Sequence, residues 1–105
     1  MIELENLIKK RVKEKRFELI LQVFDKINFE RVLIPEEYSK DTFYDFLKWK
    51  IGNSLGMRYD KQLSFIYSQK SEELQERLLK NLEYDFKQEQ FEILSNIYFE
   101  FGKDR

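Results

Sequence analysis

The sequence predicts an all-α fold, a small bundle of four to five helices in a single domain that spans residues 1–105. The chain contains only one Pro and three Gly, so few residues interrupt regular structure. Large apolar residues recur at spacings of three and four, which is typical of helices with one buried face. A chain of this length has room for one modest core.

The first third of the chain carries two apolar stripes that lie on different sides of a helix wheel. Two helices, or one long helix with two apolar faces, both account for this change. The alternative is an α+β fold with an N-terminal hairpin at about 17–34, because "FELILQVF" and "FERVLI" are rich in strand-forming residues. We favour helices, since the intervening "DKIN" lacks the Gly of a tight turn. The first stripe contains Leu4, Leu7, Ile8 and Val12, and the second contains Phe17, Ile20, Leu21, Phe24 and Ile27.

Pro35 marks the clearest boundary, and a polar link and a new helix are expected after it. Ser39 or Asp41 is suited to cap that helix. Gly52 or Gly56 is suited to end it with a left-handed residue, before a shorter helical piece. The stripe of the helix consists of Phe43, Phe46, Leu47, Ile51 and Leu55.

The last segment, residues 71–101, begins with "SEEL", whose acidic residues favour the first turn of a helix. Its apolar stripe changes phase at "KQEQ", residues 87–90. An unbroken helix would measure about 46 Å, against roughly 33 Å for a compact chain of this size. We therefore expect a bend there. Leu74, Leu78, Leu82 and Phe86 precede the change, and Phe91, Leu94, Ile97, Tyr98 and Phe101 follow it.

The composition excludes several classes of function. The absence of Cys and His removes disulfides, thiol or imidazole catalysis and the usual zinc sites. No Gly-rich phosphate loop occurs, because the glycines lie at 52, 56 and 102. We predict that the protein is not an enzyme and has no catalytic, cofactor-binding or metal-binding residues. No apolar run approaches the length of a membrane span, so we expect a cytoplasmic protein without a membrane partner.

The apolar content predicts a protein partner. Apolar residues make up 42% of the chain without any Ala, and 17 residues are aromatic. So small a globule cannot bury them all, and an exposed apolar patch usually marks an interface. Residues 1–35 carry a net charge of +2 and residues 71–105 a net charge of −4, which suits head-to-tail packing. We predict a helical interaction module (a small subunit, adaptor or inhibitor) that forms a homodimer, with Trp49, Tyr98, Phe99 and Phe101 as interface candidates.

A nucleic-acid-associated protein is the alternative function. The stretch "KKRVKEKR", residues 9–16, holds six basic residues in eight positions. On a helix, Lys9, Lys13 and Arg16 share one face with Lys10 at its edge, a spacing that fits phosphate contacts. The interleaved acidic residues and a pI near 5.6 make this alternative the less favoured one.

Overall fold

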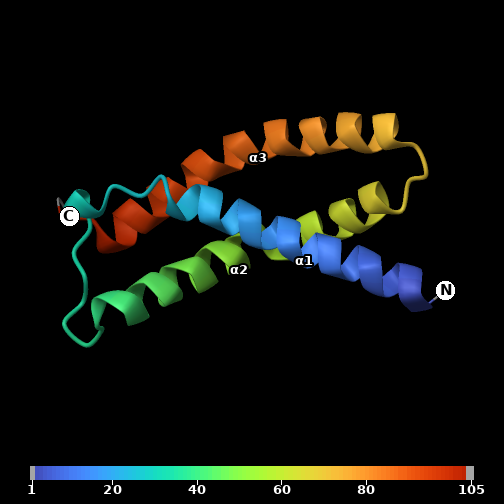
Figure 1. The fold of residues 1–105 in the computed structure, drawn as a ribbon. Helices are drawn as coiled ribbons and strands as arrows, with labels where there is room; N and C mark the ends of the chain where they lie inside the picture. Colours follow the sequence, from blue (N-terminus) through green and yellow to red (C-terminus); the bar gives the residue numbers. More distant parts are fainter. Residues whose placement is uncertain (1, 104–105) are drawn as a thin grey trace.

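The computed structural model describes residues 2–103 and has an all-α fold, which confirms the predicted class. Within these residues, three α-helices and one short 3-10 helix follow one another: α1 (Ile2–Phe24), η1 (Phe29–Arg31), α2 (Lys40–Tyr67) and α3 (Glu72–Phe101). Successive α-helices run in opposite directions, and α1 crosses in front of α2 (Figure 1). The boundaries expected at Pro35 and before residue 71 do separate helices, but the prediction of four to five helices is wrong, because the changes expected in the first third of the chain, at Gly52 or Gly56 and at residues 87–90 do not divide a helix in two.

The alternative hairpin at 17–34 is also wrong. Residues 17–24 belong to α1 and residues 29–31 form η1. Among residues 2–103, the only β-bridge joins Val32 to Gly102, and it fixes the loop before α2 against the end of α3. The strand-forming residues of 17–24 lie in a helix because the buried positions there, Leu19 and Val23, repeat at helical spacing.

Helix α2 begins after one of the two predicted caps, and it bends at one of the two glycines that were expected to end it. The Ser39 side chain accepts a hydrogen bond from the backbone N–H of Thr42 at 3.2 Å, so Ser39 is the N-cap. Gly56 has a φ of 66°, which only glycine adopts readily, and the helix is kinked there. The kink redirects α2 without ending it, which removes one helix from the predicted count.

Helix α3 runs unbroken from Glu72 to Phe101 after its N-cap, Ser71. The bend expected at residues 87–90 is absent because Gln90 occupies the core position of that turn. Its side chain is 3% exposed and accepts a hydrogen bond from Lys26 Nζ at 2.6 Å. The buried stripe therefore continues through a polar residue, and the adjacent Phe91 lies outside it.

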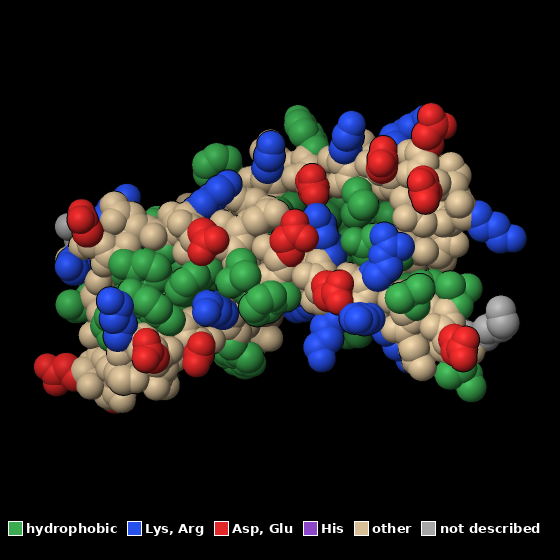
Figure 2. Space-filling model, viewed as in Figure 1, with side chains coloured by type: hydrophobic (Ala, Val, Ile, Leu, Met, Phe, Trp, Pro, Cys, Tyr) green, Lys and Arg blue, Asp and Glu red, His purple; other side chains and the backbone are tan. Residues whose placement is uncertain are grey.

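The molecule is long and thin, with principal extents of 49 × 26 × 17 Å. Its radius of gyration is 16.1 Å, whereas a compact chain of this length has about 13 Å. Figure 2 shows hydrophobic side chains in the hollows between the helices, with charged side chains spread over the rest of this face. The buried hydrophobic residues are Val12, Leu19, Val23, Ile27, Val32, Phe43, Leu47, Ile51, Leu55, Tyr59, Leu63, Ile66, Leu82, Phe86, Ile93 and Ile97.

Candidate protein interface

The basic run of α1 divides into residues that face solvent and residues that face other helices. Lys9, Lys10 and Lys13 are exposed. Lys15 Nζ instead donates a hydrogen bond to Glu83 Oε1 on α3 at 2.8 Å. Arg16 is half-buried and contacts α2. The predicted basic face therefore keeps three lysines for an outside partner, and its nucleic-acid role stays a prediction.

Arg16 binds the backbone of α2 at its kink. Its Nη1 donates to the carbonyl oxygen of Gly56 at 2.8 Å and to Asp60 Oδ1 at 3.1 Å, while Nη2 donates to the carbonyl oxygen of Gly52. A kink removes helical partners from nearby carbonyls, and a buried carbonyl without a partner is costly. One guanidinium supplies the replacement donors, because its planar fork can serve two acceptors at once. Arg16 thus has a structural role.

The four aromatic interface candidates have different surroundings. Tyr98 and Phe101 are half-buried. The Tyr98 hydroxyl accepts a hydrogen bond from the Asn28 N–H at 2.8 Å, and the Phe101 ring meets Phe43 edge-on at 5.2 Å. Trp49 is 62% exposed and Phe99 is 79% exposed. Only Trp49 and Phe99 present most of their surface to solvent.

A polar cleft of about 410 Å³ lies between the second half of α2 and the middle of α3. The Tyr59 hydroxyl donates a hydrogen bond to Glu89 Oε2 at 2.5 Å, and Arg58 forms an ion pair with the same carboxylate. Burial of the hydroxyl and its bond to Glu89 raise the pKa of Tyr59 to about 12. Among residues 2–103, no group of three or more carboxylates is placed to hold a metal ion. The cluster joins the two helices.

We expect the raised pKa of Tyr59 to make stability fall at high pH. Between pH 10.0, its ordinary pKa, and about 12, Tyr59 ionises in the unfolded chain but stays protonated in the folded one. The folded state therefore binds more protons, and the free energy of unfolding decreases as pH rises. Denaturant titrations at about pH 9 and about pH 11.5 should show a smaller decrease for Tyr59→Phe than for the parent. Tyr84→Phe, at an exposed ring, is the matched control, and equal decreases in all three proteins would refute the assignment.

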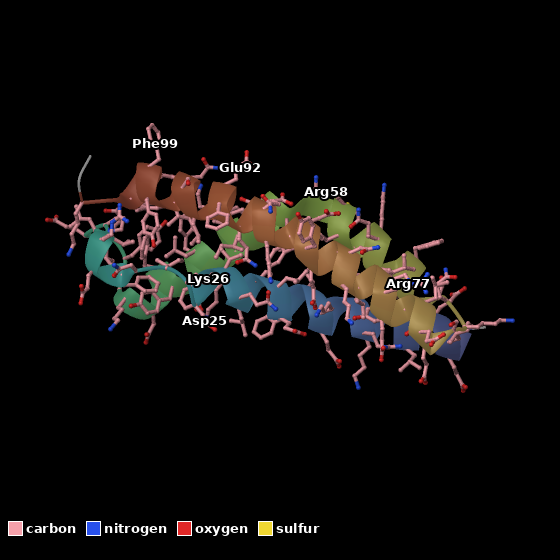
Figure 3. The ribbon with its side chains drawn as sticks, turned by 90° about the horizontal axis from the view of Figure 1, so that it is seen from above. Asp25, Lys26, Arg58, Arg77, Glu92 and Phe99 are labelled. Atoms are coloured by element: carbon pink, nitrogen blue, oxygen red, sulfur yellow. The ribbon has the colours of Figure 1, made fainter. Side chains whose placement is uncertain are left out.

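The outer face of α3 carries three exposed aromatic side chains, which we call the aromatic stripe: Tyr84, Phe91 and Phe99. They are 67%, 71% and 79% exposed. Their spacings of seven and eight residues place them on one side of the helix, opposite the buried stripe. Figure 3 shows Phe99 projecting from α3 away from α1. Hydrophobic side chains also protrude along the upper edge of the molecule, over α3 (Figure 2).

Charged residues of opposite sign border the aromatic stripe. Lys80 and Lys87 lie on one flank, and Asp85 and Glu92 on the other, as their positions on the helix require. All four side chains are exposed. Within the described part of the chain, the ion pairs involve other residues and leave these four without a partner.

Sequence reasoning singled out Phe99 but missed Tyr84 and Phe91. Phe91 was assigned to the buried stripe because the polar Gln90 was not expected in the core. The signal that identifies the missed residues is their spacing. Phe91 follows Tyr84 by seven residues and Phe99 follows Phe91 by eight, which keeps all three on one side of a helix.

The N-terminal end of α1 is a second exposed apolar surface. Ile2, Leu4 and Leu7 are 77%, 54% and 54% exposed and line a shallow hollow. A further hollow on α1 is lined by Phe17 and Ile20 beside Lys10 and Lys13. Neither surface presents three exposed aromatic side chains on one helix face, as the aromatic stripe does, so the stripe is the strongest interface candidate.

Comparison of the chain with protein-family models, with curated proteins and with solved structures finds no match. In residues 2–103, none of the helices combines the length and the apolar character that crossing a bilayer requires.

Proposed function

We propose that this chain is a non-enzymatic protein-interaction module that binds another protein chain through the aromatic stripe of α3. The observation that carries the proposal is the exposure of Tyr84, Phe91 and Phe99 on the face of α3 opposite the core. Large aromatic rings supply much of the binding energy at protein interfaces, because they bury a large area for little loss of side-chain entropy. The cytoplasm is the location that we predict.

The accessible surface area of the chain is larger than that of a compact monomer of the same mass, which supports an interface with a partner. The accessible surface of the chain is 7823 Å². A compact monomer of 13.0 kDa would expose about 6,300 Å². The difference of about 1,500 Å² exceeds the roughly 800 Å² that each partner buries in a standard interface. The thin molecule therefore exposes more surface than a compact monomer would, and the excess is large enough to form one interface of standard size.

We expect a photoreactive benzoylphenylalanine at position 84, 91 or 99 to form covalent adducts with a partner chain in cells that express the protein. The reactive group at these positions would lie within the interface. Position 65 on α2 is the matched control, because Phe65 is another exposed aromatic residue, 61% accessible, outside the stripe. Irradiated cells are analysed by electrophoresis and mass spectrometry. The proposal is wrong if positions 84, 91 and 99 give no adducts, or only those that position 65 also gives.

A further inference from the structure

We infer that the partner of the aromatic stripe is a second copy of this chain, whose α3 packs against the first in parallel orientation and in register. This inference rests on the proposed function and specifies the partner. Over residues 81–95, the outer face of α3 has the seven-residue spacing of a two-stranded coiled coil, which ends where Tyr98 packs within the chain. Tyr84 and Phe91 occupy one seam position of that repeat, and Asn81, Gln88 and Ser95 occupy the other. All five side chains are exposed.

The charges on the flanks of the stripe select the parallel orientation. In a parallel pair related by a two-fold axis along the helices, each flank meets the opposite flank of the partner, five residues further along. Lys80 then lies beside Asp85 of the second copy, and Lys87 beside Glu92 of the second copy. In an antiparallel pair each flank meets its own equivalent, so lysines would face lysines and carboxylates would face carboxylates. Only the parallel pair is attractive.

The same five-residue relation continues with apolar residues at the C-terminal end of α3. Leu94 follows Lys87 by seven residues, and Phe99 follows Glu92 by seven. In the parallel pair Leu94 therefore meets Phe99 of the second copy. This contact accounts for a phenylalanine that is 79% exposed in the single chain. Figure 3 shows Phe99 and Glu92 on the edge of α3 that faces away from α1, where a second copy has access.

The polar seam residues limit the strength of this pairing. Asn at such a position favours a parallel two-stranded register but lowers stability, and Gln88 and Ser95 add little apolar area. We therefore expect a reversible dimer with a dissociation constant of about 1–100 μM.

Single cysteines test the orientation directly, because the chain contains none of its own. In the parallel dimer, residue 95 lies beside residue 95 of the second copy, within the short distance that a disulfide spans. We expect Ser95→Cys, and likewise Gln88→Cys, to form a disulfide-linked dimer under mild oxidation. In an antiparallel dimer, positions 88 and 95 would instead face the other seam position, that of Tyr84 and Phe91, so neither single variant would cross-link efficiently. Met57→Cys is the control, since Met57 is 71% exposed but lies on α2.

Charge reversal tests the register. We expect Lys87→Glu or Glu92→Lys to weaken dimerisation about tenfold in sedimentation equilibrium, because each change replaces two attractive pairs by two repulsive ones. The double variant should recover most of the affinity. Lys61→Glu, at an exposed position of α2, should leave the affinity unchanged.

Two results would overturn the inference: disulfide formation by Ser95→Cys no faster than by Met57→Cys, or a double charge variant no better than the single ones. If a monomer is found but benzoylphenylalanine at position 91 forms adducts with a different protein, the second copy is the wrong partner while the proposed function stands. If positions 84, 91 and 99 all form no adducts, both fail.

Discussion

Phe86→Ala is expected to lower the free energy of unfolding by about 3–5 kcal/mol. The Phe86 side chain is 1% exposed and its ring meets that of Tyr59 edge-on at 5.8 Å, so it joins α3 to α2. Truncation removes buried apolar area and leaves a cavity that the thin molecule has few neighbouring side chains to fill. Urea unfolding followed by circular dichroism measures the change.

Phe65→Ala is the matched control for Phe86→Ala. Phe65 is the same residue type but 61% exposed on α2, so its truncation should change the free energy of unfolding by less than about 1 kcal/mol. Equal losses for the two variants would mean that α3 does not pack on α2 through Phe86.

Arg16→Met is expected to lower the free energy of unfolding by about 3 kcal/mol, because it removes charged donors from two carbonyls at the kink of α2. Methionine keeps most of the apolar stem of the side chain, so the loss reports the guanidinium contacts with Gly52, Gly56 and Asp60. Arg16→Lys should recover only part of it, since a single ammonium cannot reproduce the fork.

Lys13→Met is the control for Arg16→Met, because Lys13 lies on the same helix but is exposed. Its effect on the free energy of unfolding should stay within about 0.5 kcal/mol. A similar small effect for Arg16→Met would show that water or a relaxed backbone satisfies the carbonyls at the kink equally well.

The local features of the fold follow from short sequence signals. Ser39 and Ser71 cap helices because their hydroxyls accept backbone N–H groups in the first turn. Gly56 bends α2 because it tolerates a positive φ. Each of these depends on the residue and its immediate neighbours, and so each could be predicted from the sequence.

The number of helices could not be predicted, because polar residues occupy core positions. In α1, Lys15 and Arg16 lie between Val12 and Leu19 on the buried side, where Glu83 and Asp60 neutralise them. In α3, Gln90 lies between Phe86 and Ile93 and is satisfied by Lys26. These partners are 44 or more residues away in the sequence, so the apolar stripes look broken until the tertiary structure is known.

The candidate interface was predicted only in part, for the same reason. Phe99 and Trp49 are exposed, as an interface residue must be, whereas Tyr98 and Phe101 pack within the chain. Phe91 was placed in the core because the phase of the buried stripe cannot be followed through Gln90. Once Gln90 is recognised as buried, Phe91 is left on the outer face.

Sedimentation equilibrium of the unmodified chain, from low micromolar to millimolar concentration at physiological salt, tests the central claim most directly. We predict an average mass that rises with concentration from 13.0 kDa toward twice that value, as a reversible dimer requires. A mass of 13.0 kDa at every concentration would contradict self-association through α3.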